Sequence, residues 1–195
     1  MAKIRNLIIQ FLILLFISCT ISCKYKNNAK IKQFVGDSLI STKLYFTILT
    51  TKKTSQLLEN QNNLYIKNFS KFKSTTISTS TDLNIKLIKA NTPNEKDLKI
   101  NLYTYLKDKK VDSIQFYRNL SGGKFGHFNT LSYFNSKKNK FWQIQYFPTN
   151  PLRGNTPGII SYTEKSITQE GLITTDSIHY LDESLQAVLD ENNLY

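Results

Sequence analysis

Apolar and polar residues alternate most regularly between residues 83 and 102. Leu83, Ile85 and Leu87 are separated by polar residues, and the same alternation returns over 98–102 after the turn-forming segment 91–94. Side chains two residues apart lie on one face of a strand, so the pattern predicts an antiparallel pair with one buried face. β-Branched and aromatic residues predict further strands at 44–50, 113–117, 128–134, 141–147, 159–163, 166–168, 172–174 and 177–180.

Two segments have apolar residues at helical spacing. Over 54–72 these residues recur every three or four positions, which predicts a helix, although 64–66 would also suit the start of a strand. An apolar stripe of three leucines and a valine over 181–189 predicts a second helix. Asp182 and Glu183 stand at its start, where the helix dipole favours anions. We expect this stripe to pack on the sheet.

The order of these elements predicts an α+β fold. Segments 107–110, 135–139 and 169–171 are short and polar, as hairpin connections are, so successive strands should pair in a meander. We expect a mostly antiparallel meander sheet of about six to eight strands with one or two covering helices. A β-sandwich is the alternative.

The first 23 residues follow a different pattern. Lys3 and Arg5 precede an apolar run over 7–17, and Cys19 and Cys23 each follow a serine. This is the organisation of a secretory signal peptide. It resembles the signal of bacterial lipoproteins, which implies that a cysteine thiol receives a diacylglycerol and becomes the new N-terminus. Ordinary secretion and a retained transmembrane anchor are the alternatives, but the apolar run falls short of the roughly 20 residues that span a bilayer.

The resemblance leaves two candidate thiols. Residues 16–19 and 20–23 both resemble the lipobox, and neither has Leu three places before its cysteine. We assign the lipid to Cys23, with Cys19 as the alternative, because cleavage at Cys23 leaves no unpaired thiol in an oxidising envelope. The implied organisation is a signal peptide over 1–22, a flexible tether over 23–32 and a single β-rich domain over 33–195.

The N-terminal signal and the net charge of the chain predict where the protein is located and what it binds. Residues 24–27 lack the acidic side chains that follow the cysteine in some surface-exported lipoproteins, so we expect a lipid-anchored domain that faces the periplasm. The chain carries 26 Lys and Arg against 14 Asp and Glu, a net charge of +12, which attracts anions. Its lysines are spread along the chain, as biased nucleotide composition would also produce. We expect another envelope protein or an anionic glycan as partner, and no nucleic acid.

Few residues offer catalytic or metal-binding chemistry. His127 and His179 are the two histidines, and no cysteine after residue 23 can complete a zinc site with either. No H-E-x-x-H, G-x-S-x-G or P-loop spacing occurs. We therefore predict no catalytic residue, no metal and no cofactor, and an enzyme is the less favoured class.

One candidate binding segment is rich in glycine. Three glycines within 122–126 surround Lys124 and precede His127, so backbone N–H groups there would be free to face an anion. A turn with positive φ explains the same glycines. Lys124 and His127 are the candidate ligand-binding residues of this segment.

A second candidate combines Trp142, Tyr146 and Arg153 with the proline-containing loop 148–158. Trp, Tyr and Arg are enriched in binding hot spots, and loops of this length carry function. Strand alternation offers a competing explanation, in which Trp142 and Tyr146 face the core and the glutamines at 143 and 145 face water.

Three Asp-Ser-apolar triplets stand at 37–39, 112–114 and 176–178. They are similar to the acceptor used for O-glycosylation of envelope proteins in some bacteria, which makes candidates of Ser38, Ser113 and Ser177. Asp-Ser pairs also begin strands and turns through local hydrogen bonds, so both interpretations stand.

The predicted role is a lipid-anchored cell-envelope protein that acts as a non-enzymatic interaction or binding module through the loop 148–158. A flat exposed aromatic patch would favour this role. The first alternative is a carrier or sensor of a lipophilic or anionic ligand, which an apolar cavity between sheet and helix would favour. The second is a hydrolase acting on envelope polymers, which convergent carboxylates in a cleft would favour.

Overall fold

A computed structural model of the chain describes residues 33–49, 54–78, 82–92, 94–121, 128–152, 154 and 156–193. Phe34–Tyr195 belongs to one compact unit. Within the described residues, no helix has both the length and the apolar character needed to cross a membrane.

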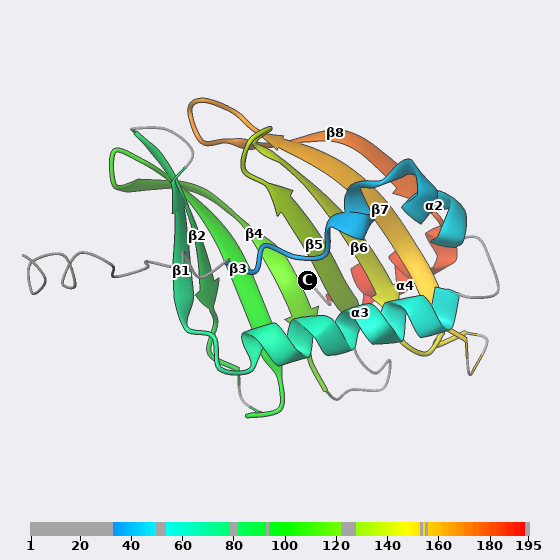
Figure 1. Cartoon of the computed structure of the whole chain (residues 1–195). Coiled ribbons are helices and arrows are strands. Elements are labelled where there is room, and N and C mark those ends of the chain that lie inside the picture. The colour runs from blue at the N-terminus through cyan, green and yellow to red at the C-terminus, as the bar shows by residue number, and fades with distance from the viewer. Residues whose placement is uncertain are drawn as a thin grey trace, which may run out of the picture. The chain divides into compact units, whose positions relative to one another are not determined.

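One open sheet of eight antiparallel strands forms the centre of this unit, and each strand pairs with the next along the chain (Figure 1). The strands are β1 (Ser74–Ser78), β2 (Leu83–Lys89), β3 (Leu98–Leu106), β4 (Lys109–Asn119), β5 (Asn129–Asn135), β6 (Lys140–Phe147), β7 (Gly158–Ile167) and β8 (Ile173–Tyr180). The α+β meander predicted from the sequence is confirmed. The β-sandwich alternative is wrong, because the described strands all belong to the same sheet.

Alternating burial explains why β2 and β3 form. Leu83, Ile85 and Leu87 of β2 are buried between half-buried polar neighbours, and Leu87 pairs with Leu102 of β3. Apolar side chains on one face of both strands thus leave water together. The hairpin from β3 to β4 turns at Lys107, which has positive φ together with the residue after it, as tight two-residue connections require.

Helices cover both faces of the sheet (Figure 1). α3 (Thr54–Phe69) lies across the face shown in front, where Leu58, Tyr65 and Phe69 are buried. α4 (Glu183–Glu191) lies behind the sheet, where its Leu185 packs with Phe147 and other apolar residues in a second core cluster. Both helices predicted from periodicity are therefore present.

The strand predicted at 44–50 is wrong. Its described part is helical and forms α2 (Lys43–Leu49), next to the 3-10 turn η1 (Ser38–Ser41). Tyr45 and Leu49 lie four residues apart and are both buried, which is the spacing of one helix face. A short apolar run fits either structure locally, and tertiary packing decides between them.

Three further strands differ from the sequence analysis. The strands predicted at 159–163 and 166–168 form one strand, β7, and those at 172–174 and 177–180 form β8. The ladder continues through Glu164 and Lys165, where a register shift absorbs the break in alternation. β1 has no counterpart among the predicted strands because Ile77 is its one aliphatic residue.

Strands β4 and β5 separate beyond a single paired position, Arg118 with Thr130. The chain before η1 fills the gap: the N–H of Phe134 donates to the carbonyl of Val35 at 2.9 Å. Beside it lies Gly36, whose φ of +93° is open to glycine and strained for other residues. The segment 34–37 is thus hydrogen-bonded to β5.

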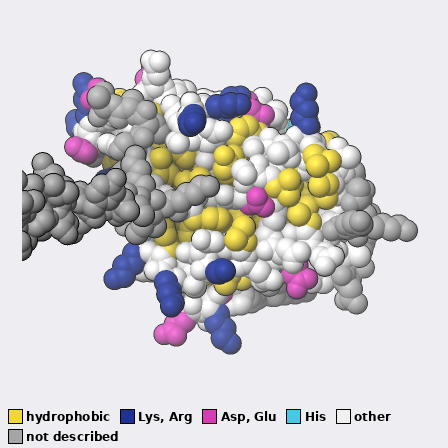
Figure 2. Space-filling view, viewed as in Figure 1, with side chains coloured by type: hydrophobic (Ala, Val, Ile, Leu, Met, Phe, Trp, Pro, Cys, Tyr) yellow, Lys and Arg dark blue, Asp and Glu magenta, His cyan; other side chains and the backbone are white. Residues whose placement is uncertain are grey.

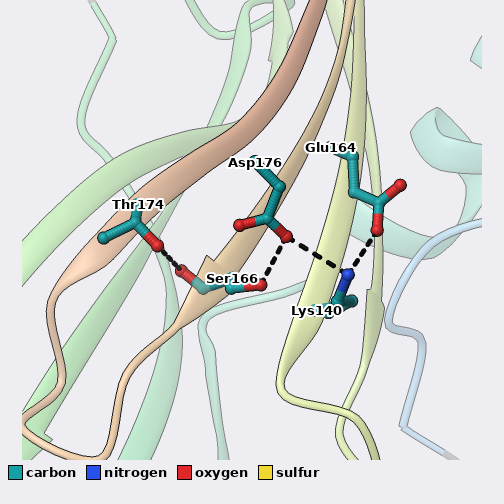
Figure 3. Close-up of polar contacts among 5 residues, drawn as sticks. All are labelled: Lys140, Glu164, Ser166, Thr174 and Asp176. Carbon is teal, nitrogen blue, oxygen red and sulfur yellow. Dashed lines mark hydrogen bonds and ion pairs between the residues drawn. The ribbon is translucent and has the colours of Figure 1, made fainter.

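A small polar cluster links the outer strands β6, β7 and β8 (Figure 3). Lys140 Nζ lies 2.6 Å from a carboxylate oxygen of Glu164 and 3.2 Å from one of Asp176. The Ser166 hydroxyl also donates to Asp176. Since these side chains are about one third exposed, water screens the ion pairs and their net contribution to stability is small.

Candidate functional site

A cavity of about 320 Å³ lies where α3 passes the ends of β4, β5 and β6. This volume is near the lower end of the roughly 300–1,000 Å³ typical of small-molecule sites. The described residues that line it are Ser55, Leu58, Glu59, Asn62, Asn119, Asn129, Tyr146, Pro148 and Pro157. Most of these side chains end in a polar group, so the cavity differs from the apolar core around it.

Asn129 lines the cavity and carries a buried polar atom in an unusual environment. Its side chain is only 2% exposed, and its Nδ2 donates to the hydroxyl of Tyr146 at 3.2 Å. The Tyr146 hydroxyl in turn donates to the carbonyl of Leu58 at 3.5 Å, so its oxygen remains the acceptor for Asn129. The Oδ1 of Asn129 is buried and has no hydrogen-bond partner. A buried acceptor without a donor is costly and rare in native proteins.

A further amide of the cavity is held by Tyr117. The Tyr117 hydroxyl donates to Oδ1 of Asn62 at 2.9 Å. Burial raises the pKa of Tyr117, and a hydrogen bond from the side chain of Asn119 opposes that rise. Tyr117 therefore fixes the orientation of the Asn62 amide.

The cavity carries little charge. Glu59 is its one formally charged lining residue among those described, and no Lys or Arg lines it. Burial raises the pKa of Tyr146 to about 12, so its phenol stays protonated at neutral pH. Figure 2 shows the face that carries α3, where Lys and Arg side chains are scattered around the margin rather than gathered at one place. Among the described residues, positive charge is therefore not focused on this cavity.

The described residues offer neither a pair of catalytic carboxylates at the cavity nor a metal-binding cluster. A lone carboxylate at the cavity cannot supply the acid and base pair of a carboxylate hydrolase. The part of the chain that the structure describes contains no group of three or more His, Cys, Asp or Glu side chains that could hold a metal ion.

A second hollow of about 520 Å³ lies beside the β2–β3 connection and is lined by Lys73, Lys89, Glu95 and Asp97, among others. Its main polar groups already have partners within the protein. Lys89 Nζ donates to the carbonyl of Ser70 at 3.1 Å, and Asp97 accepts from the N–H and hydroxyl of Ser121. It is therefore a weaker candidate than the cavity beneath α3.

The two aromatic residues predicted to bind a partner lie in different surroundings. Tyr146 lines the cavity, whereas Trp142 is 8% exposed and stacks on Tyr133 with ring centroids 6.1 Å apart. Both face the core, so they form no exposed aromatic patch. Gln143 does not face water as alternation suggested: it is buried and donates to the carbonyl of Gln115 at 2.7 Å. Its hydrogen bonds keep it on an otherwise buried face.

Several predicted site residues lie outside the described residues. These are Cys19, Cys23, Lys124, His127 and Arg153. The loop 148–158 is described in part, and its Pro148 and Pro157 line the cavity.

The three candidate O-glycosylation serines are described, and each follows an aspartate with a structural role. Asp37 caps η1, Asp112 accepts from the N–H of Ile173 at 2.9 Å, and Asp176 belongs to the cluster of Lys140. The candidates differ in accessibility. Ser38 and Ser113 are exposed, whereas Ser177 is half-buried in β8.

Sequence patterns miss Asn62, Asn119 and Asn129, because isolated asparagines match no motif. One signal was present at Asn129. It lies two residues before Leu131, which is buried on the core face of β5, so alternation calls for an apolar residue there. A polar residue at a core position of a strand is a departure from pattern of the kind found at functional sites.

Comparisons with protein-family models, with curated proteins and with solved structures find no match to this chain.

Proposed function

We propose that this chain is a non-enzymatic binding module, held at a bacterial cell envelope by a lipid on Cys23, that receives a polar ligand in the cavity beneath α3. The observation that carries the binding role is a cavity of small-molecule size whose described lining is mostly polar. Side-chain amides at such a cavity offer hydrogen bonds that a polar ligand or ordered water can complete.

The lining supports this role over its alternatives. A carrier of a lipophilic ligand needs mainly apolar walls, whereas three asparagines and a glutamate line this cavity. A hydrolase of envelope polymers needs convergent carboxylates, and Glu59 stands alone among the described lining residues. The two prolines from the loop 148–158 add a rigid wall, so the loop predicted to bind a partner contributes to the same place.

The test follows the side-chain amides of the cavity by NMR in the full chain. Simple polar probes, namely acetamide, methanol, methylammonium and methyl glucoside, are added separately. A probe that enters should shift the amide resonances of Asn62 and Asn119 and leave the exposed Asn68 of α3 unchanged. If none of the four probes shifts the cavity amides, only water occupies the cavity and the binding role is wrong.

Paired substitutions connect such a signal to the cavity. Asn129→Leu replaces a polar lining residue at nearly constant volume, and Asn68→Leu makes the same chemical change on the exposed side of α3. We expect the first to weaken binding of any active probe and the second to leave it unchanged. Equal effects of both variants would contradict a site at the cavity.

A further inference from the structure

Strands β1 to β4 have a second surface, on the side of the sheet that faces away from the buried apolar residues of β2 and β3. Strand register places the residues of this surface, because side chains at paired positions lie on the same face of a sheet. Lys86 pairs with Tyr103, and Lys99 pairs with Arg118. We call this surface the basic face. Its described charged residues are Lys86, Lys99, Lys110 and Arg118.

Among the described residues of β1 to β4, no acidic side chain lies on the basic face. Asp112 is the one acidic residue of these strands, and it pairs with Thr104, which is buried on the core side. Asp97, just before β3, attracts Arg118 electrostatically. Its carboxylate is only 6% exposed and already accepts two hydrogen bonds from Ser121. The four cations therefore share one face with no exposed counter-ion on the described part of these strands.

Two of the cations stand directly opposite each other. Lys99 and Arg118 are cross-strand partners, and like charges at such positions repel. Arg118 is 9% exposed, its guanidinium lies over the ring of Phe128 at 4.2 Å, and its Nε is closed to solvent. A ligand would therefore contact Lys99 and be attracted by the charge of Arg118 at longer range. An anion beside Lys99 relieves the repulsion between the two side chains.

Tyrosine rings hold the other two cations against the sheet. Lys86 Nζ lies 4.3 Å from the centroid of the Tyr105 ring, and Lys110 Nζ lies 4.6 Å from that of Tyr103. An ammonium group on a ring keeps the N–H groups that point away from the ring for an anion. Tyr105 follows Lys99 by six residues on β3, so the cations extend over about 20 Å. This length exceeds one small anion and fits a chain that carries several negative charges.

The surroundings of the cations distinguish between classes of polyanion. Single-stranded nucleic acid is bound by stacking bases on open aromatic rings, whereas lysines lie over both tyrosine rings of this face. Insertion into a bilayer uses exposed apolar side chains. Val111 is the one large apolar residue among the described residues of β1 to β4 that is exposed, and it lies with Leu83 beside Gly171 on the core side. Neither feature of a nucleic-acid or membrane surface is therefore present on the described part of the basic face.

From these observations we infer that the basic face binds a linear acidic polysaccharide, a glycan chain with carboxylate, sulfate or phosphate groups on its sugars, laid across β2, β3 and β4. Two amides lie between the cations on the same face. Asn101 uses its Nδ2 on Tyr103, and Gln115 uses its Oε1 on Thr130, which leaves the opposite ends for sugar hydroxyls. No residue of the basic face lines the cavity beneath α3, so this is a second site and does not depend on the proposed cavity ligand.

Polysaccharide fragments of equal length test the inference in the full chain. Oligogalacturonate and chondroitin sulfate fragments are the acidic probes, and dextran fragments are the neutral control. Two further polyanions are tested beside them: vesicles of phosphatidylcholine with phosphatidylglycerol, and oligothymidylate. We expect an acidic fragment to bind, to shift backbone amides of β2, β3 and β4 by NMR, and to leave the side-chain amides of Asn62 and Asn119 unchanged. Added salt should weaken this binding, and dextran should not bind.

Matched variants separate the basic face from the net charge of the chain. One variant combines Lys86→Gln, Lys99→Gln and Lys110→Gln. The control combines Lys43→Gln, Lys67→Gln and Lys138→Gln, which removes the same charge from exposed lysines of other segments. We expect the first to bind the acidic fragment at least about tenfold more weakly and the control to change its affinity by less than about twofold. Lys99→Gln alone removes no contact between a lysine and a tyrosine ring, so it preserves the fold if the triple variant does not, and it should weaken binding by about threefold.

Four results would overturn the inference. Equal losses in the two triple variants would show that net charge alone attracts the fragment. Equal binding of dextran would exclude recognition of the acidic groups. Binding of the vesicles or of oligothymidylate in place of both acidic fragments would assign the face to another class of partner, and no binding at all would leave it without a ligand of this class. None of these results bears on the cavity, because its test follows the amides of Asn62 and Asn119.

Discussion

The hydroxyl of Tyr65 in α3 donates to the carbonyl oxygen of Ser132 in β5 at 2.6 Å, across 67 residues of sequence. The same hydroxyl accepts from the N–H of Asp37 at 2.9 Å. One phenol therefore satisfies a strand carbonyl in the gap between β4 and β5 and also holds the N-terminal segment against the sheet. Because both backbone groups need a partner away from water, Tyr65 joins three parts of the fold.

Replacement of Tyr65 by Phe should destabilise the protein by about 2 to 4 kcal/mol, because the change leaves the Ser132 carbonyl and the Asp37 N–H unpaired. Tyr105→Phe is the control. Tyr105 is half-buried on β3, where its ring lies under Lys86, and no hydrogen bond of its hydroxyl contributes to the core. Chemical denaturation should give similar slopes for both variants and a lower midpoint for Tyr65→Phe alone. Equal midpoints would contradict this role of Tyr65.

Gly36→Ala should be among the most destabilising single changes in the chain. A Cβ at this position would collide with the Ser132 carbonyl oxygen and stand 2.7 Å from the Tyr65 hydroxyl, in addition to the strain of a φ of +93°. Gly154 has a φ of +85° and no atom within 4 Å of such a Cβ, so Gly154→Ala measures the conformational strain alone. We expect a loss of about 1 kcal/mol for Gly154→Ala and at least about 3 kcal/mol for Gly36→Ala. Similar losses in thermal or chemical unfolding would show that the collision is relieved.

The sequence predicts the meander because strand periodicity is a local property that the sheet preserves. Leu83, Ile85 and Leu87 need only one apolar face to form β2, and short polar connections leave few alternatives to antiparallel pairing. Helix α2 is not predicted, because its residues suit a helix and a strand equally well. Contacts with residues distant in the sequence decide which one forms. One of these is Gln61, whose Oε1 accepts from the hydroxyl of Tyr45 at 2.8 Å.

The cavity is harder to predict for the same reason. Its asparagines come from α3, β4 and β5. Asn62 accepts from Tyr117 and Asn129 donates to Tyr146, and neither pair lies close together in the sequence. The net charge of +12 favours an anionic ligand, but no described lysine lines the cavity, so the charge of the chain does not indicate where a ligand binds. Tyr146 was identified by residue type and loop position, although its role is at a cavity and not on an exposed patch.

The Asp176 carboxyl should titrate below its ordinary value in the folded protein. A hydrogen bond from Ser166 is the largest cause of its lowered pKa, and Lys140 acts in the same direction (Figure 3). Ser166→Ala and Lys140→Gln should each raise that pKa toward 3.8, and Ser113→Ala should not. NMR titration of the side-chain carboxyl measures the shift. An unchanged pKa in both variants would show that the cluster is not formed in solution.

The stability that Asp176 contributes follows from the same direction of shift. Because its folded pKa is lower than its unfolded pKa, the folded state binds fewer protons between the two values. The contribution is therefore present above a pH of about 3.8 and is lost as the pH falls through the folded pKa. Ser166→Ala should reduce this acid-dependent part and leave the alkaline limit of stability unchanged.

Alkaline pH should unfold the domain through its buried tyrosines. Burial raises the pKa of Tyr146 from 10.0 to about 12, and burial also raises the pKa of Tyr162 to about 12. A folded pKa above the unfolded one means that stability is intact below pH 10 and falls as the pH rises toward 12. Phenolate absorbance and circular dichroism should change together over this window. Gradual phenolate formation with an unchanged dichroism spectrum would contradict burial of these phenols.

The proposed lipid anchor predicts a specific pattern of acylation. Cells that express the full chain are grown with labelled palmitate, and the wild type is compared with Cys19→Ala and Cys23→Ala. If Cys23 is the acceptor, Cys23→Ala abolishes the label and leaves uncleaved precursor, whereas Cys19→Ala is labelled as well as the wild type. The reverse result assigns the lipid to Cys19.

Two other outcomes would contradict the anchor as proposed. Labelling that survives each single change but not both together would show that the leader does not direct one acceptor thiol. An unlabelled wild type in the membrane fraction would indicate a retained apolar segment, and an unlabelled chain outside the membrane would indicate ordinary secretion or none. The binding cavity is independent of these results, because its lining residues belong to Phe34–Tyr195 and both cysteines precede that unit. Loss of the anchor would therefore change where the domain binds its ligand without changing which ligand it binds.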